Sequence, residues 1–319
     1  MQQKQYKPFK KAFTLLEMII VMVVLGIIAN FGVEMLVNTY QNYIFTSVQN
    51  RLQSQSESAV KQIANRLEYR IKESIIAKDS GSGKYHKLVS APATFDADML
   101  EWVGSDREGW LGRTNVPLWS GFIDINNPAG AKNIAGGNLI SPQTDTGAVN
   151  TLISTLSNAN SNINDAALFS IEANTGTTNF GWDGAITSQR GSLHPIEQVA
   201  GQNDEFAAKA GTGNFVNGGF ITEFYKLTWT AYAVRFEDKD GDGANELWLY
   251  YDYQPWAGED YTNGKSEQLM DNVTTFAFKV DGSVVNLQVC VNDRDIFNDD
   301  GDNDETTGSY SVCKEKTVF

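Results

Sequence analysis

Cysteine and histidine, the side chains that most often bind transition metals or act as nucleophiles and bases, are scarce in this chain. There are two of each: Cys290 and Cys313, His86 and His194. His86 lies in a Gly/Ser/Lys-rich stretch and His194 precedes a proline, so neither belongs to a recognisable catalytic motif. The Gly-Thr-Gly at 211–213 lacks the strand and helix that a nucleotide-binding loop requires. The sequence therefore predicts that the protein is not an enzyme.

Basic residues are too few to balance the acidic ones. The formal net charge is −14 and the pI is near 4.6, so the folded part would repel nucleic-acid phosphates, and we expect no nucleic-acid partner. The hydrophobic share of 41% suffices for one or two folded domains. Residues 1–12 are the exception in charge: they carry four lysines and no acid, and without them the net charge would be −18.

A long apolar segment follows this basic start. Residues 13–33 read FTLLEMIIVMVVLGIIANFGV, and the stretch from Met18 to Ala29 contains no polar side chain. A helix of about 21 residues spans roughly 30 Å, the thickness of the hydrocarbon core of a bilayer. The lysines before it predict a cytoplasmic N-terminus, because positive charge is retained on that side.

Two general explanations of this segment each leave something unexplained. A cleaved secretory signal requires small residues at a cleavage site after the apolar run, and the residues after Ala29 fit that requirement poorly. A plain membrane anchor accounts for the length but not for Glu17. A carboxylate inside a membrane span costs roughly 2.5–3.5 kcal/mol on insertion scales, so Glu17 needs a reason to be there.

The stretch KAFTLLEMIIVMVVLGIIA resembles the type III signal of type IV prepilins and type II secretion pseudopilins. In that family a short basic leader is followed by a small residue, usually Gly and here Ala12, and then by FTLLE. The resemblance implies that prepilin peptidase cuts between Ala12 and Phe13 on the cytoplasmic side and N-methylates Phe13. It also implies a bacterial inner-membrane protein with a periplasmic head, which later enters a pilus or pseudopilus.

The resemblance assigns a role to Glu17 as well. In the family, the glutamate at this place meets the N-terminal amine of a neighbouring subunit in the filament, and an ammonium group would relieve a carboxylate held in hydrocarbon. The alternative is that Glu17 extends its carboxylate to the edge of the membrane. The implied partners are prepilin peptidase, other pilin or pseudopilin subunits and the inner-membrane assembly platform.

The helical pattern continues beyond the membrane segment. Apolar residues recur mostly at spacings of three, four or seven along one face, and no Pro or Gly interrupts residues 34–78. The members of that face are Val48, Leu52, Ala59, Ile63, Leu67, Ile71 and Ile75. We therefore divide the chain into a leader (1–12), a transmembrane assembly segment (13–37), an amphipathic continuation of the same helix (38–78) and a β-rich head (79–319).

The head has a clear strand pattern only towards its C-terminus. The runs FYKLTWTAYAVRF, ELWLYYDY, FAFKV and SVVNLQVCV predict four antiparallel strands packed on the helix, an α+β fold. Residues 79–220 are rich in Asn, Gly, Ser and Thr, which predicts short strands, long loops and a short helix within 147–160. The C-terminal strands also look like those of larger minor pilins and J-type minor pseudopilins.

An acidic turn, DKDGDGANE, separates the first two of these strands. Alternate carboxylates in a tight turn converge on one point, and their oxygens suit Ca²⁺. The candidate ligands are Asp238, Asp240, Asp242, the main-chain carbonyl of Ala244, and Glu246. The twelfth position of an EF-hand loop is here Leu249, so the turn would be a shortened variant. The alternative is a solvated acidic hairpin.

Cys290 and Cys313 flank a second acidic run, at 293–305. In an exported protein such a pair most simply forms a disulfide, although two buried thiols are the alternative. The second run has no clear ligand spacing, and charge runs usually face solvent.

These features predict a structural minor subunit of a type IV pilus or a type II secretion pseudopilus. The alternative is a pilus-borne adhesin or DNA-uptake module, in which residues 79–220 contact a ligand.

Overall fold

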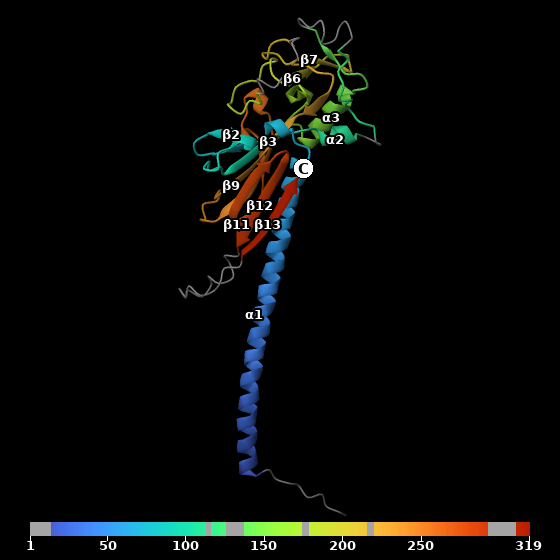
Figure 1. The fold of residues 1–319 in the computed structure, drawn as a ribbon. Coiled ribbons are helices and arrows are strands. Elements are labelled where there is room, and N and C mark those ends of the chain that lie inside the picture. Colours follow the sequence, from blue (N-terminus) through green and yellow to red (C-terminus); the bar gives the residue numbers. More distant parts are fainter. Residues whose placement is uncertain (1–13, 113–115, 126–136, 174–178, 216–219, 293–310) are drawn as a thin grey trace, which may run out of the picture. The chain divides into compact units, whose positions relative to one another are not determined.

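The computed structural model describes residues 14–112, 116–125, 137–173, 179–215, 220–292 and 311–319. Its first element is the helix α1 (Leu15–Leu67), drawn in blue in Figure 1. The chain divides into two compact units, one ending at Arg51 and the other running from Leu52 to Phe319. The second unit is called the head below.

The N-terminal unit contains the apolar part of α1, whose large side chains are all exposed from Leu15 to Val37. Among the described residues, α1 is the single helix long and apolar enough to cross a membrane; its best window has a mean hydropathy of 2.4. The helix beginning close to Phe13 confirms the prediction of a long apolar helix. An element that exposes so much apolar surface is suited to lipid or to other helices rather than to water.

The part of α1 that belongs to the head buries one face. Leu52, Ala59, Ile63 and Leu67 are all at most 3% exposed, as their spacing predicts. The guanidinium of Arg66 lies 6.0 Å from the ring centre of Tyr232, on a strand of the large sheet. The C-terminal end of α1 therefore packs against the sheet.

The predicted helix end at residue 78 is wrong, because α1 ends at Leu67. Ile71 then donates its main-chain N–H to Val103 and joins the sheet, and the short 3₁₀ helix η1 (Lys72–Ser74) and strand β1 (Ile76–Lys78) follow. Ile71 and Ile75 are buried as predicted, but in extended backbone. β-Branched residues favour such backbone, and helical spacing cannot distinguish the two ways of burying them.

The head is built on an eight-stranded antiparallel sheet with the order β13-β12-β11-β10-β9-β3-β1-β2. Its strands, besides β1, are β2 (Tyr85–Lys87), β3 (Met99–Gly104), β9 (Thr230–Glu237), β10 (Asn245–Tyr253), β11 (Lys265–Asp281), β12 (Val284–Asn292) and β13 (Ser311–Val318). Figure 1 shows the long strands β9, β11, β12 and β13 side by side. The predicted hairpin at Asp281–Gly282 joins β11 to β12. An α+β architecture with antiparallel strands is thus confirmed.

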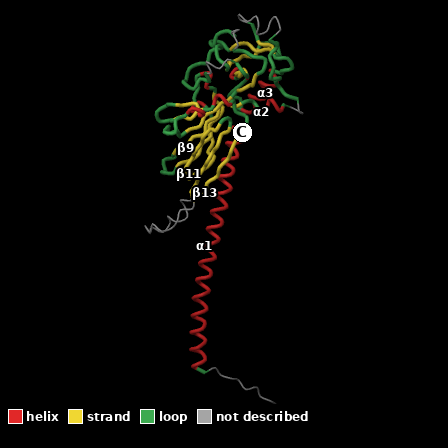
Figure 2. The backbone as a smooth tube through the Cα atoms, viewed as in Figure 1, coloured by secondary structure: helices red, strands yellow, loops and turns green. Residues whose placement is uncertain are grey.

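A second, five-stranded antiparallel sheet contains short strands from the region 79–220, for which short strands and long loops were predicted. Its order is β4-β7-β6-β5-β8, and its strands are β4 (Leu139–Ile140), β5 (Ala167–Ser170), β6 (Leu193–Gln198), β7 (Glu205–Ala208) and β8 (Tyr225–Thr228). The helices α2 (Arg107–Leu111) and α3 (Thr146–Leu156) lie in the same region (Figure 2), and α3 confirms the predicted short helix. The sheet has its own apolar core, which includes Ile153, Leu168, Phe206 and Leu227.

The two sheets are joined where one predicted strand divides. The run from 224 to 236 is β8 up to Thr228 and β9 from Thr230, with the buried Trp229 between them. β8 pairs with β5 in the small sheet, whereas β9 pairs with β3 and β10 in the large one. The single strand predicted here is therefore wrong: two short strands share one continuous β-like sequence.

Candidate functional site

The assembly segment begins at the N-terminal end of α1. Glu17 lies in the first turn of the helix, and its main-chain N–H is 3.3 Å from the hydroxyl of Thr14, which caps that turn. Carboxylates are favoured at this end of a helix, because unpaired N–H groups give it a partial positive charge. Ala12 and Phe13, the predicted cleavage pair, lie outside the described residues.

The side chain of Glu17 is exposed and surrounded in sequence by exposed apolar residues. Across the described part of the chain, no Lys or Arg forms an ion pair with it. A carboxylate in this setting needs a cation from elsewhere once the apolar helix leaves water. Glu17 is thus a charged group in the first turn of a helix whose following residues, Met18 to Ala29, are all apolar.

Residues 8–29 match the family described as the prokaryotic N-terminal methylation motif. The chain is a type IV pilin-like protein. The match covers the last residues of the predicted leader and the start of the apolar helix, the stretch in which the sequence resembles prepilins. No curated protein and no solved structure matches the chain. The motif implies processing by prepilin peptidase, and together with α1 it indicates anchoring in a membrane.

The acidic turn of the pilin-like head joins β9 to β10. One carboxylate oxygen from each of four residues lies within 4.8 Å of the others, and these residues are Asp238, Asp240, Asp242 and Glu246. The three aspartates are exposed and Glu246 is buried. The structure thus brings together the four predicted side-chain ligands.

Main-chain amides hold the turn in shape. Asp238 accepts hydrogen bonds from Gly241 (2.8 Å) and Gly243 (3.0 Å), and Asp242 accepts one from Ala244 (2.6 Å). Gly241 and Gly243 both have φ near +80°, which glycine adopts readily and other residues rarely do. The local sequence thus provides both the carboxylates and the backbone that gathers them.

Glu246 is fixed from the other side by the strand residues. Its Oε2 accepts hydrogen bonds from the main-chain N–H of Lys239 (3.0 Å) and from Nε1 of Trp248 (3.1 Å). The ammonium of Lys239 lies 3.8 Å from the ring centre of Trp248 and bonds to Ser266. In the part of the chain that the structure describes, no basic side chain ion-pairs with the four carboxylates.

The predicted disulfide is present. Cys290 and Cys313 are bonded and lie directly opposite each other on β12 and β13, with their Cα atoms 4.0 Å apart. This bond covalently ties the edge strand β13 to the sheet. The second acidic run, at 293–305, lies outside the described residues.

Both histidines have surroundings that account for them structurally. His86 makes an edge-on ring contact with Phe95 at 4.6 Å. His194 is fully buried in β6, where its ring nitrogens lie 3.2 Å from Oε1 of Gln189 and 3.1 Å from the carbonyl of Phe220. Burial lowers the pKa of His194 to about 4, so the ring is neutral at physiological pH.

Several buried charged residues were missed by sequence reasoning. Asp252 pairs with Lys265 (2.9 Å), and Glu101 pairs with Lys78 (3.1 Å). Burial raises the pKa of the Glu101 carboxyl, and the nearby ammonium opposes that rise. Each pair joins residues on two paired strands of the large sheet, so no local sequence motif predicts it.

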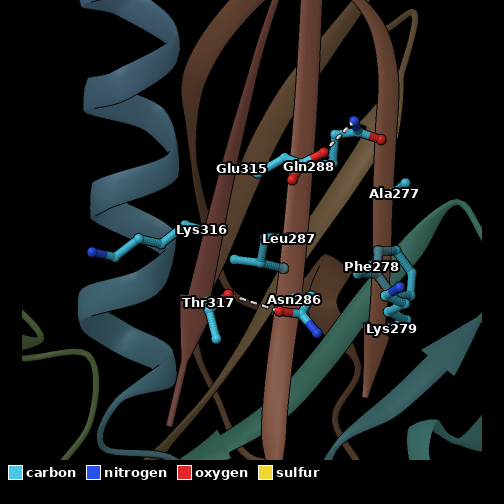
Figure 3. A pocket seen from close by; sticks show the side chains of 9 residues that line it. All are labelled: Ala277, Phe278, Lys279, Asn286, Leu287, Gln288, Glu315, Lys316 and Thr317. Atoms are coloured by element: carbon cyan, nitrogen blue, oxygen red, sulfur yellow. Dashed lines mark hydrogen bonds between the residues drawn. The ribbon is translucent and has the colours of Figure 1, made fainter. Parts of the chain in front are cut away.

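A shallow groove of about 370 Å³ crosses β11, β12 and β13 (Figure 3). Its polar side chains bond one another across the strands: Gln288 donates to Glu315, and Thr317 donates to Asn286, both at 2.8 Å. Donors and acceptors satisfied in this way stabilise the sheet. We therefore interpret the groove as part of the solvent-facing side of the three strands.

Proposed function

We propose that the protein is a structural, non-enzymatic minor subunit of a type IV pilus or a type II secretion pseudopilus. The observation that carries this proposal is the methylation motif at 8–29, continued by a helix whose apolar side chains are exposed. Prepilin peptidase would cut between Ala12 and Phe13 and methylate the new amine of Phe13. The apolar helix then anchors the subunit in the inner membrane until assembly.

Glu17 is proposed to direct that assembly. In a stack of apolar helices, a carboxylate and the N-terminal ammonium of the next subunit satisfy each other, whereas either alone is costly in hydrocarbon. Contacts between smooth apolar helices fix their relative height poorly. One charge pair per subunit selects a single register, because any other leaves both charges unpaired.

The charge pattern and the disulfide support a cytoplasmic leader and a periplasmic head. Four lysines precede the apolar segment, which retains the N-terminus on the cytoplasmic side. The Cys290–Cys313 bond suits an oxidising compartment such as the periplasm. The subunit would there meet other pilin-like subunits and the inner-membrane assembly platform.

Mass spectrometry of the chain from its native cells tests the processing step. The expected mature N-terminus is N-methylated Phe13, and a chain that retains Met1 and the leader contradicts the proposal. For the assembly step, Glu17→Ala and Glu17→Gln should abolish or strongly reduce incorporation into filaments. Glu34→Ala is the matched control, since it removes another exposed carboxylate of the same helix. Equal incorporation of all three variants would refute the role of Glu17.

The alternative function, a pilus-borne adhesin or ligand-binding module, is supported by aromatic side chains near the small sheet. Trp110 and Phe224 are 48% and 58% exposed, and Phe224 forms a pair with Phe122 at 6.3 Å. Exposed aromatic residues are enriched where proteins bind partners. If this function holds, Trp110→Ala with Phe224→Ala reduces surface attachment or DNA uptake while filament number stays unchanged. Unchanged attachment and uptake would contradict the adhesin function, and only the structural role would then stand.

We also propose that the acidic turn binds Ca²⁺ through Asp238, Asp240, Asp242, Glu246 and the carbonyl of Ala244. The support is the approach of four carboxylates without a basic partner among the described residues, since a cation would relieve their repulsion. The ion would stabilise the β9–β10 turn at extracellular calcium concentrations.

Thermal unfolding of the full chain in CaCl₂ and in chelator tests this proposal. At ten times the Kd, bound Ca²⁺ should stabilise the head by about 1.4 kcal/mol. Asp240→Asn should remove the shift and Asp271→Asn, an exposed acid elsewhere on the head, should keep it. Identical melting in calcium and chelator would contradict the site.

A further inference from the structure

A basic groove lies on this otherwise acidic protein, where η1 and the 3₁₀ helix η2 (Leu88–Ser90) approach the β11–β12 turn. It has a volume of about 410 Å³. Its lining includes two lysines, Lys72 and Lys87, one acid, Glu73, and four apolar residues, Ile75, Leu88, Val89 and Val280. Val89 is 70% exposed, so an apolar side chain is available for contact at the edge of the groove. The groove thus offers both positive charge and apolar contact area.

Positive charge around the groove is concentrated rather than paired. Lys72 and Lys87 are exposed, and within the described ranges neither they nor Lys226 of β8 forms an ion pair. Burial lowers the pKa of the half-buried Lys226; the nearby Glu73 opposes this, and the charges of Lys72 and Arg70 add to it. The charges of Glu73, Lys72 and Arg70 therefore all act on Lys226.

Arg70 adds a buried charge beneath the same corner. It is 2% exposed and donates to the main-chain oxygens of Leu67 (2.6 Å), Ser283 (2.7 Å) and Phe319 (3.3 Å). Its Nε is buried and has no hydrogen-bond partner. Among the described residues, these main-chain oxygens rather than a carboxylate side chain bind the guanidinium.

We propose that the basic groove docks an acidic segment on the head of a neighbouring pilin-like subunit, an inference that rests on the proposed function. Carboxylates of the partner would meet Lys72 and Lys87, and an apolar side chain would cover Val89. Charges arranged in this way orient two heads when their subunits assemble. The whole chain has a formal net charge of −14, and acidic heads of this kind need such a local attraction to approach closely.

An acidic protein segment fits the groove better than an anionic membrane does. An anionic bilayer would face the net negative charge of the head over an extended area, with only two exposed lysines of the groove to attract it. A single acidic segment reaches the groove without bringing an extended negative surface near the head. Lipid contact is therefore kept as an outcome of the test.

Site-specific photocrosslinking of the full chain in its native cells tests the proposal. A photoreactive side chain at Val89 should give an adduct with another protein that carries a prepilin-type N-terminus, identified by mass spectrometry. Lys72→Glu with Lys87→Glu should reduce that adduct about tenfold or more, because the attraction becomes repulsion. Lys72→Arg with Lys87→Arg should retain it, and so should the control pair Lys61→Glu with Lys279→Glu.

The outcomes separate this inference from the proposed function. An adduct that persists in the Glu variants, an adduct with phospholipid, or no adduct from a chain processed at Phe13 overturns the docking surface alone. A chain that is never processed overturns the proposed function and the docking surface with it. A photoreactive side chain at Ile186, which is 61% exposed outside the groove, should not give the same adduct.

Discussion

Between Leu15 and Val37 the large apolar side chains of α1 are 48–79% exposed, whereas on its inner face between Leu52 and Leu67 the apolar side chains are at most 5% exposed. Both stretches belong to one helix and are rich in Leu, Ile and Val. Burying one such side chain contributes about 1.5–3 kcal/mol. The first stretch therefore leaves most of its stabilisation to be gained outside the chain, and the second has already gained it inside the head.

This contrast shows how one helix serves two purposes. Polar residues are few before Val37 and become frequent after it, where Thr39, Gln41 and Asn42 begin an amphipathic pattern. The apolar stretch can exchange lipid for other helices without disturbing the head, because its side chains take no part in the core of the head. A subunit that moves from a membrane into a filament needs this separation.

The largest expected effect compares the same substitution in the two stretches. Leu67→Ala removes a fully buried side chain and should lower the free energy of unfolding of the head by about 2–5 kcal/mol. Leu25→Ala, at a position 59% exposed, should leave it unchanged. All seven tryptophans lie in the head, so tryptophan fluorescence during urea unfolding in detergent measures the head alone. An equal loss of unfolding free energy in both variants would contradict the difference between the two stretches of α1.

The disulfide provides a second test of the difference between the head and the N-terminal stretch, because it links two residues of the head. Cys290→Ser with Cys313→Ser opens a loop with a sequence separation of 23 and should cost the head roughly 3 kcal/mol. Processing at Phe13 and membrane anchoring should continue, since the N-terminal stretch does not depend on the bond. Pulse labelling would follow processing and urea unfolding would follow the head. Unaltered stability of the double variant would contradict the expected role.

The pH dependence of the head should contain two opposite contributions. Burial raises the pKa of Asp106 to about 6, so the folded state holds its proton more tightly than the unfolded state, and stability falls as pH rises from about 4 to 6. The pKa of His194 is lowered to about 4, so its contribution makes stability rise with pH over the same window.

Asp106→Asn isolates the first contribution. The amide oxygen can still accept from Gly109 or Trp119, while the carboxylate charge is gone. Relative to the wild type, the variant should gain on the order of 2 kcal/mol between pH 4 and 7. Urea unfolding at several pH values measures this difference. A difference between the two proteins that does not change with pH would show that Asp106 is not the group responsible.

The parts of the fold that sequence reasoning found are those whose signal is local. The N-terminal motif, the acidic turn and the strands β9 to β12 all depend on residues close together in the chain. The end of α1 was missed because Ile71 and Ile75 satisfy helical spacing while sitting in extended backbone. The hydrogen bond from the main-chain N–H of Ile71 to Val103, which shows that this segment is extended, cannot be predicted from residue spacing.

The small sheet could not be found in this way. Its strands have two to six residues, too few for a periodic pattern, and each pairs with a partner far along the chain, as Leu168 of β5 does with His194 of β6 and Leu227 of β8. The cations of the basic groove likewise come from separate elements. Tertiary packing brings these cations together, and the spacing of residues in the sequence does not predict such packing.

The smallest expected effect exchanges glycine and alanine in opposite directions. Ala159 follows α3 with φ at +63°, a conformation that disfavours any residue with a Cβ, so Ala159→Gly should stabilise the head by about 0.5–1 kcal/mol. Gly32 lies within α1 with no atom near an added Cβ, so Gly32→Ala should favour the helix by about 1 kcal/mol. Tryptophan-detected unfolding should register the first change and not the second. A head that responds to Gly32→Ala would show that the two stretches of α1 are coupled, and the independence of anchor and head would have to be abandoned.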